Sequence, residues 1–225
     1  MYFQQRQQLP PATKNLIIIN ALIFVATMLN EDFMISTFGL FYPTSRYFHF
    51  WQPLTHMFMH GGIWHIFFNM FSLWMFGSVI EQYIGSRKFL ILFIVAGLGG
   101  AALHMGVEWI QAQTYMAGIA EGSSKAMLAY ESLKLTPTVG ASGAIYGLLI
   151  TYAMLFPDAT LMLLFPPIPM KAKWMVVIFA LVELLTGVSS VASGIAHFAH
   201  LGGMLFGWML VRYWKNKGTL FDNRW

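Results

Sequence analysis

Residues 88–106 read KFLILFIVAGLGGAALHMG, an apolar run whose only charged residue is the lysine at its start. A membrane-spanning helix needs about 20 mostly apolar residues, so this stretch predicts a transmembrane helix. The whole chain has the same character: 57% of its 225 residues are hydrophobic, 10% are charged, and its mean hydropathy is +0.61. Soluble domains carry about 25% charged residues. The composition therefore indicates an integral membrane protein.

Five further apolar runs predict spans at residues 15–29, 64–83, 142–156, 172–188 and 196–214. With six spans, both chain ends and the even-numbered loops share one side of the membrane. Ten of the 13 Lys and Arg residues fall there, and positive charge accumulates on the cytoplasmic side. We therefore expect an all-α polytopic membrane protein with six transmembrane helices and both termini in the cytoplasm. The basic residues are read as topology signals, so no nucleic-acid partner is expected.

The chain is expected to form one membrane domain over residues 1–225. Residues 1–14 and 215–225 are read as cytoplasmic tails. Residues 31–63, rich in aromatic side chains, form an outer loop that lies against the membrane. Residues 107–139 form a second outer loop, within which residues 123–135 have the pattern of a short surface helix. The first apolar run is followed by no small-residue cleavage site, so it is interpreted as an uncleaved anchor.

Polar residues inside spans are costly and are therefore functional candidates. Ser142 opens the fourth span between Gly140-Ala141 and Gly143. At a helix start it lies beside backbone N–H groups that have no helical partner, and such groups can bind a developing oxyanion. For the motif alone, the alternative is a small packing residue or a helix cap.

His200 lies near the start of the sixth span, and Gly203 and Gly207 follow it on the same helix face. Both spans begin on the outer side, so Ser142 and His200 are expected at one depth, on two helices that can approach closely. This suits a nucleophile and its general base. No acidic residue is near either motif in the sequence, so we expect a dyad. His197 is a rival base, disfavoured because the glycine face belongs to His200.

A third set of polar residues surrounds the start of the second span. His65 and Asn69 share a helix face at i and i+4, and both can donate a hydrogen bond to an oxyanion. His56 and His60 precede them in the outer loop and are expected to brace it. A metal site is the alternative, because this histidine spacing suits metal ligands. The absence of cysteine excludes disulfides and thiolate chemistry.

Taken in order, these motifs resemble the rhomboid family of intramembrane proteases over roughly residues 51–207. Residues 51–69 are similar to the end of that family's first outer loop and the start of its second helix, and Glu81 falls where the family places a Glu. Gly140-Ala141-Ser142-Gly143-Ala144-Ile145-Tyr146 is similar to the nucleophile motif. His200 with Gly203 and Gly207 is similar to the histidine motif.

The resemblance implies a rhomboid-like bundle that hydrolyses peptide bonds in transmembrane protein substrates within the lipid bilayer, without metal or other cofactor. It implies Ser142 as nucleophile, His200 as base, and Tyr146 stacked beside His200. It further implies that His65, Asn69 and the backbone N–H of Ser142 form the oxyanion hole. The supporting residues are His60, Gly140, Gly143 and Gly203. A bacterial cytoplasmic membrane is the expected location, and the sequence carries no signal for an oligomeric state.

One departure from the family pattern, one unexplained residue and two rival functions accompany this interpretation. The family often has Trp-Arg in the first outer loop, where this chain has Trp51-Gln52. Glu183 lies in the fifth span, which the family uses as a lateral gate; it is a gate candidate, with pairing to Thr186 or snorkelling outward as alternatives. One rival is a catalytically inactive relative that binds membrane clients. The other is a membrane di-iron oxidase, disfavoured by the small number of histidines.

Overall fold

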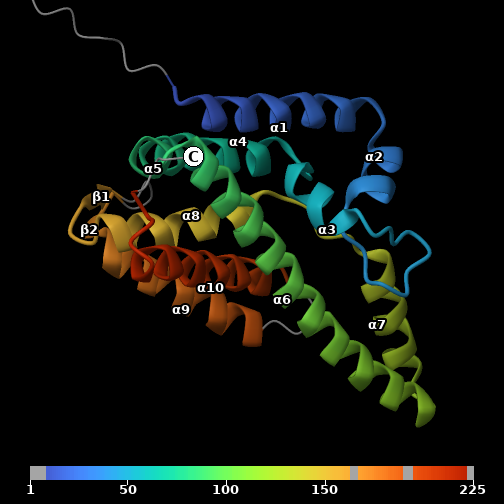
Figure 1. The fold of residues 1–225 in the computed structure, drawn as a ribbon. Coiled ribbons are helices and arrows are strands. Elements are labelled where there is room, and N and C mark those ends of the chain that lie inside the picture. Colours follow the sequence, from blue (N-terminus) through green and yellow to red (C-terminus); the bar gives the residue numbers. More distant parts are fainter. Residues whose placement is uncertain (1–8, 163–166, 190–194, 222–225) are drawn as a thin grey trace, which may run out of the picture.

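The protein is described by a computed structural model that covers residues 9–162, 167–189 and 195–221, and it is built almost entirely of helices (Figure 1). In chain order its elements are α1 (Pro11–Leu29), α2 (Glu31–Phe38), α3 (Gln52–Thr55), η1 (His56–Phe58), α4 (Ile63–Ser72), η2 (Leu73–Gly77), α5 (Ser78–Ile84), α6 (Ser86–Ala120), α7 (Ser124–Leu135), α8 (Ser142–Leu155), β1 (Thr160–Met162), β2 (Pro169–Lys171), α9 (Ala172–Ser189) and α10 (Ile195–Asn216).

The expected all-α class is confirmed, since the only sheet in the described ranges is the antiparallel pair of three-residue strands β1 and β2. The predicted tails are covered only in part, because residues 1–8 and 222–225 lie outside the described residues.

The number of spans differs from the expectation. Within the described ranges, four segments are long and apolar enough to cross a membrane, namely Pro11–Leu29, Ile63–Ile84, Ser86–Ala120 and Ala172–Ser189. The expected fourth span, α8, has only 14 residues, and the expected sixth span, α10, is not among the four although it has 22. Helix α8 is too short to be counted and is mostly buried by protein, whereas two histidines and three glycines lower the mean hydropathy of α10.

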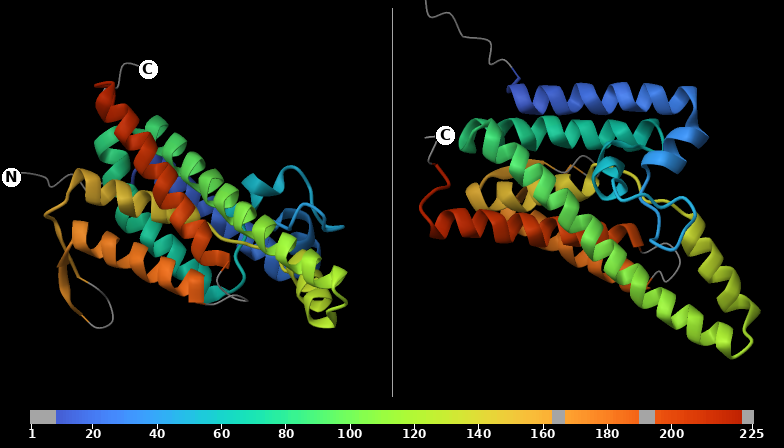
Figure 2. Two further views of the ribbon diagram at one scale, coloured as in Figure 1. Left: turned by 90° about the horizontal axis from the view of Figure 1, so that it is seen from below. Right: turned by 45° about the vertical axis from the view of Figure 1, so that its right-hand side comes forward.

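The second outer segment is more helical than expected. Helix α6 does not end near residue 106 but continues to Ala120, a length of 35 residues. The helix predicted over residues 123–135 is confirmed as α7, whose first turn is capped by the Ser123 hydroxyl accepting from the Ala126 N–H. Both views in Figure 2 show α7 folding back along the C-terminal part of α6. Residues 107–139 are therefore mainly a helical hairpin.

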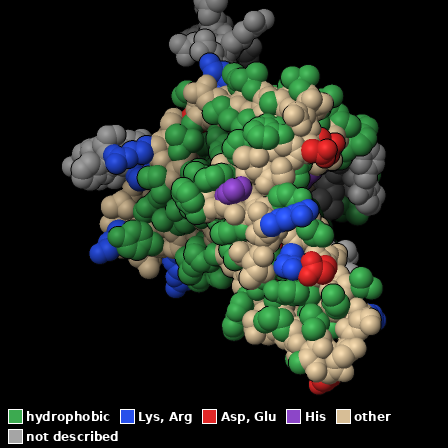
Figure 3. Space-filling view, turned by 90° about the vertical axis from the view of Figure 1, so that its right-hand side faces the viewer, with side chains coloured by type: hydrophobic (Ala, Val, Ile, Leu, Met, Phe, Trp, Pro, Cys, Tyr) green, Lys and Arg blue, Asp and Glu red, His purple; other side chains and the backbone are tan. Residues whose placement is uncertain are grey.

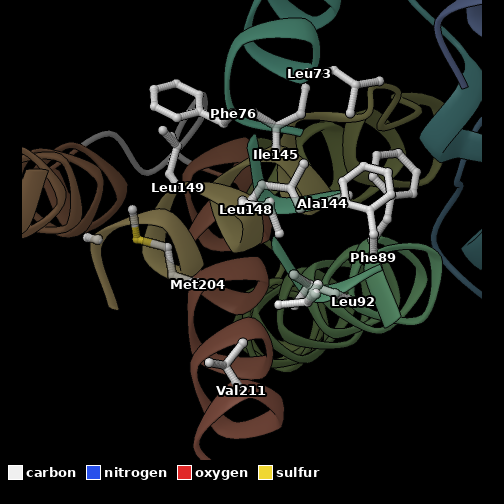
Figure 4. Close-up of a cluster of buried hydrophobic side chains, with 14 of the residues drawn as sticks. Leu73, Phe76, Phe89, Leu92, Ala144, Ile145, Leu148, Leu149, Met204 and Val211 are labelled. Carbon is white, nitrogen blue, oxygen red and sulfur yellow. The ribbon is translucent and has the colours of Figure 1, made fainter. Parts of the chain in front are cut away.

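The hydrophobic core lies where η2, α5, α6, α8 and α10 meet. Fully buried side chains from these elements point toward one another, as Figure 4 shows for Leu73, Phe89, Leu92 and Leu148. Large apolar side chains also cover the outside: Leu22, Met28, Leu29, Trp64 and Leu185 are each more than 60% exposed. In Figure 3 hydrophobic side chains cover much of one face, with charged side chains in a few small groups. Apolar groups on both sides of the helices are typical of a bundle surrounded by lipid.

Helices α6, α8 and α10 cross at glycines, and this crossing positions the site. A Cβ added at Gly203 of α10 would lie 1.9 Å from the carbonyl oxygen of Gly143 in α8. A Cβ added at Gly147 would lie 2.3 Å from the Cβ of Ala96 in α6 and 3.0 Å from the Gly203 carbonyl oxygen. Small residues let membrane helices approach at backbone contact. The start of α8 is therefore held directly against the start of α10.

The beginning of α1 is tied to the bundle by Glu81 of α5. This buried carboxylate accepts from the backbone N–H groups of Ala12 and Thr13 at 2.9 and 2.7 Å. It also accepts from the hydroxyls of Thr13 and Ser86 at 2.8 and 2.6 Å. A helix N-terminus offers unpaired N–H groups and a favourable dipole for a carboxylate. Glu81 therefore joins three helices through one side chain.

The first outer loop is braced by Gln52 rather than by an arginine. Its fully buried side chain donates to the Tyr47 carbonyl at 2.7 Å and lies 3.3 and 3.4 Å from the carbonyls of Thr37 and Ser36. Its oxygen accepts from the Phe41 N–H at 3.3 Å. An amide has donors and an acceptor, so Gln52 bonds to both kinds of backbone group. The departure at this position therefore does not leave the loop unsupported.

Candidate active site

Ser142 and His200 meet at the start of α8 and α10. The Oγ atom of Ser142 lies 2.8 Å from Nε2 of His200, within hydrogen-bond distance although the residues are 58 positions apart. The glycine contact between Gly143 and Gly203 is adjacent to this pair and fixes the helices at that separation. His197, the rival base, points to another group. The structure thus brings together the two residues selected from the sequence.

Tyr146 lies one turn after Ser142 and covers one face of the His200 ring. The two rings are parallel, with centroids 4.2 Å apart and an interplanar angle of 5°. Stacking of aromatic rings stabilises a pair beyond its buried area, and here it restricts rotation of the imidazole. Two residues of α8 therefore hold the His200 ring, Tyr146 at one face and Ser142 at one edge.

A carboxylate contacts His200, contrary to the sequence-based expectation. Oε1 of Glu183 in α9 lies 3.0 Å from Nδ1 of His200, to one side of the direction of a linear hydrogen bond. The other oxygen lies 2.5 Å from Nδ1 of His197, and the Tyr146 hydroxyl donates to Oε1. Glu183 is buried, so the snorkelling alternative is wrong. Pairing with Thr186 is wrong as well, because that hydroxyl donates to backbone carbonyls.

His65 lies on the other side of Ser142, beside Gly140. A Cβ built at Gly140 would be 2.8 Å from Nε2 of His65 and 3.6 Å from Oγ of Ser142. Both side chains therefore border the same small space. The φ of Gly140 is +131°, a conformation that side-chain-bearing residues rarely adopt. This position therefore requires glycine both for its conformation and for the room it leaves around Ser142.

Asn69 lies one turn after His65 on α4 and is buried. Its amide nitrogen donates to the His65 carbonyl oxygen at 3.0 Å. An amide nitrogen has two N–H groups, so this bond leaves one of them for another acceptor. The structure thus keeps His65 and Asn69 together, as expected from their spacing, and directs one Asn69 donor along its own helix.

His56 and His60 support the site from the outer loop. The carbonyl oxygen of His56 accepts from the Gly140 N–H at 2.9 Å, which anchors the loop before α8. The His60 ring packs edge-on against His65, with centroids 5.1 Å apart. Burial lowers the pKa of both His56 and His60 to about 4, and nearby His65 contributes at His60. At neutral pH both rings are therefore uncharged.

A small cavity lies behind Ser142, with room for about one water molecule. Its lining includes His56, Gly140, Ser142 and Ala199. The site as a whole combines a serine hydroxyl within hydrogen-bond distance of an imidazole nitrogen, helix-start N–H groups, and the His65 ring bordering the space beside that hydroxyl. These are the parts needed for nucleophilic attack on a carbonyl and for binding the oxyanion that results.

Comparison with known proteins identifies a family for this chain. The Rhomboid domain model of protein families matches residues 47–216. The chain is 31% identical over 190 residues to RHOMBOID-like protein 12, mitochondrial, of Arabidopsis thaliana, which covers 84% of this chain and 54% of that protein. It is 27% identical over 157 residues to Rhomboid protein 1, mitochondrial, of Saccharomyces cerevisiae, covering 68% and 40% of the two chains.

A third relative is Rhomboid protease GlpG of Yersinia pestis, 24% identical over 216 residues, or 95% of this chain and 66% of that protein. The chain thus spans only part, in one case less than half, of the length of these relatives. The family match, by contrast, covers most of the chain, including both helices that meet at the site. A membrane-embedded helical bundle with Ser142 against His200, matched across that whole region, places this chain in the rhomboid family.

Proposed function

We propose that this protein is an intramembrane serine endopeptidase that hydrolyses peptide bonds in or near transmembrane segments of membrane proteins. The observation that carries the proposal is the 2.8 Å contact between Oγ of Ser142 and Nε2 of His200 at a glycine-mediated helix crossing. Membership of the rhomboid family supports protease activity at the family level. The substrates are other membrane proteins that reach the site through the bilayer.

The chemistry assigned to the pair conserves atoms and charge. Ser142 Oγ bonds to the substrate carbonyl carbon while its proton passes to Nε2 of His200. The resulting oxyanion collapses, the C–N bond breaks, and His200 gives that proton to the leaving amine. Water then attacks the acyl ester and gives a proton to His200, which returns it to Oγ as the carboxylic acid leaves. This is the general course of acyl transfer by a serine and its base.

The oxyanion is assigned to donors on two helices. The backbone N–H of Ser142 lies in the first turn of α8, where N–H groups have no helical partner. His65 borders the space around Ser142, and Asn69 retains one N–H after bonding to the His65 carbonyl. Each donor stabilises negative charge that exists only after attack, which is why such donors lower the barrier.

The location of the protein follows from its charge and its relatives. It is a multi-pass membrane protein, and we propose that both termini lie on the side rich in Lys and Arg. A bacterial cytoplasmic membrane stays a prediction, because the relatives include mitochondrial proteins as well as a bacterial one.

A fluorophosphonate probe tests the proposal in purified, detergent-solubilised protein. We expect covalent labelling at Ser142, loss of labelling in Ser142→Ala, and loss of cleavage of a transmembrane reporter in the same variant. Ser132→Ala is a matched control, because this serine is exposed on α7. Equal cleavage by Ser142→Ala would refute the assignment. Absence of label and cleavage in the unaltered protein, with membrane clients still bound, would favour a catalytically inactive client-binding protein.

A further inference from the structure

The carboxylate of Glu183 is the meeting point of three side chains from two neighbouring helices. Oε1 accepts from the Tyr146 hydroxyl of α8 and lies 3.0 Å from Nδ1 of His200 in α10. Oε2 lies 2.5 Å from Nδ1 of His197, also in α10. Glu183 itself belongs to α9. A single carboxylate therefore joins α8, α9 and α10 at the depth of the proposed nucleophile.

The two nitrogens of the His200 ring face different partners. Nε2 faces the Ser142 hydroxyl at 2.8 Å, and Nδ1 has Oε1 of Glu183 beside it at 3.0 Å, off the line of a hydrogen bond. An imidazole that is to accept the serine proton at Nε2 must carry its own proton at Nδ1. A carboxylate beside Nδ1 favours that tautomer, because a carboxylate can only accept.

We infer that Glu183 is a positioning residue for His200, making the proposed Ser–His pair part of a Ser142–His200–Glu183 arrangement. This inference rests on the proposed function. When His200 takes the serine proton it becomes an imidazolium, and the carboxylate stabilises that charge without accepting a proton. The oxygen that faces Nδ1 is the one that binds the Tyr146 hydroxyl, so Glu183 orients both the imidazole and the ring stacked on it.

Burying the Glu183 carboxylate costs free energy unless other groups pair with it. The Glu183 side chain is only 9% exposed, and α9 is one of the segments able to cross the membrane. A charged group at membrane depth must be paired with other groups. Here the three groups that satisfy it are the proposed base, its stacking partner and the neighbouring His197. The polar contacts of Glu183 are therefore directed at the site and not at lipid or solvent.

A metal ion bound by the same side chains is the competing explanation. One ligand atom from each of Glu183, His197 and His200 lies within 4.8 Å of the others. Zinc bonds of about 2.0–2.1 Å at tetrahedral angles place two ligand atoms roughly 3.3 Å apart. Oε2 of Glu183 and Nδ1 of His197 are 2.5 Å apart, which is far below that spacing and even below the roughly 2.7–2.9 Å of a charge-assisted N–H···O hydrogen bond. The geometry therefore favours direct contact over ligands that surround an ion.

The decisive variant is Glu183→Gln, which keeps the size of the side chain and removes its charge. Replacing the carboxylate of a serine–histidine–aspartate site by an amide lowers kcat about 10⁴-fold. Because the contact here is off-line, we expect a smaller fall, roughly 10- to 100-fold, in the kcat for a transmembrane reporter, with KM changed less than about twofold. Glu183→Asp should recover part of the loss. Thr186→Val is the matched control on α9, since among the described residues that hydroxyl bonds to backbone carbonyls of its own helix.

A spectroscopic measurement separates positioning from a merely structural role. In protein labelled with ¹⁵N-histidine, we expect His200 in the tautomer protonated at Nδ1, and a mixture of both tautomers in Glu183→Gln. His197→Gln removes the bond to Oε2 but leaves Oε1 beside His200, so its kcat should fall less than that of Glu183→Gln. Equal falls in both variants would mean that Glu183 only ties helices together. That result would overturn the inference, as would an unchanged kcat or tautomer in Glu183→Gln.

Two results would point elsewhere. If chelator treatment of the unaltered protein removed activity and added zinc restored it, the metal explanation would replace this one. If the unaltered protein neither reacted with a fluorophosphonate nor cut the reporter, the proposed function itself would fail. An active, probe-reactive protein with an insensitive Glu183 would refute only the positioning role.

Discussion

Substituting Gly203 by Ala tests whether the glycine crossing sets the distance between Ser142 and His200. The added Cβ would lie 1.9 Å from the Gly143 carbonyl oxygen and 2.7 Å from its carbonyl carbon, both backbone atoms that cannot rotate away. A carbon–oxygen contact needs about 3.3 Å, so α8 and α10 must separate by roughly 1.4 Å. The Oγ–Nε2 distance of 2.8 Å then grows toward about 4 Å, beyond hydrogen-bond range.

The expected result has two parts. Misplacement of reacting groups by about 1 Å can lower turnover about 10²-fold, so we expect at least that loss of kcat for a transmembrane reporter. Overpacking a close-packed contact costs about 1–3 kcal/mol, so the melting temperature in detergent should also fall. The labelling rate of Ser142 by a fluorophosphonate should decrease in parallel, because it depends on the same contact.

Gly106→Ala provides the matched control. Gly106 is also a glycine within a long helix, but a Cβ added there would meet nothing within 4 Å. Alanine at such a site should stabilise the helix by about 0.5–1 kcal/mol and leave turnover unchanged. If Gly203→Ala kept both the turnover and the melting temperature of the unaltered protein, the crossing would not determine the geometry of the site.

Four further outcomes are expected. Glu81→Gln should lower the melting temperature, because a neutral amide cannot accept all the hydrogen bonds made by the carboxylate. The protein that remains folded should still cleave the reporter. Burial lowers the pKa of His56 and of His60 from the ordinary 6.5 to about 4 in the folded protein, so the unfolded state binds more protons between those two pH values. The melting temperature should therefore fall as pH drops from about 6.5 to 4, and His60→Phe should reduce that dependence. Loss of one oxyanion donor lowers kcat about 10²–10³-fold. We expect a smaller fall in Asn69→Ala, and a larger fall in His65→Ala than in Asn69→Ala. Full kcat in both variants would exclude these two residues from the oxyanion hole. Chelators should leave cleavage unchanged, and loss of activity reversed by zinc would contradict the metal-free mechanism.

The sequence was informative where function depends on local spacing. Ser142 between glycines and His200 ahead of Gly203 are short motifs whose helix faces follow from the helical repeat. Charge counting then placed both helix starts on one side. The distance between two such residues is decided by backbone contact at glycines, which is why the pair could be identified before its geometry was known.

The contact between Glu183 and His200 was not predictable in the same way. Glu183 lies 17 positions before His200, on a different helix, and no spacing rule relates residues on separate helices. The side of α9 that faces the site depends on its rotation, and its apolar residues surround Glu183 on all sides in the sequence. An acidic residue alone in a span was the only signal. That signal indicated a functional role for Glu183 but did not identify His200 as its partner.

The continuation of α6 was missed for a different reason. Beyond residue 106 the sequence includes Glu108, Gln111 and Gln113, which end the apolar run that defines a span. Helix formation does not require apolar residues when a second helix covers one face. Here α7 packs along α6, with Leu133 buried near Ala112. Hydropathy located the lipid-facing part of α6 and could not locate the end of the helix.

The length of α6 has a consequence for what can approach the site. At about 1.5 Å per residue, its 35 residues extend about 52 Å, against a hydrocarbon thickness of about 30 Å. Even at a steep tilt of about 40° it spans about 40 Å along the membrane normal, so about 10 Å of rigid hairpin stands above the lipid on the side where α8 begins. Under the proposed function, a substrate with a folded domain outside the membrane meets this hairpin before its transmembrane peptide reaches Ser142. At about 3.3 Å per extended residue, a linker of at least about three residues is needed to clear the hairpin, so the proposed protease would select substrates by linker length independently of the residues that are cut.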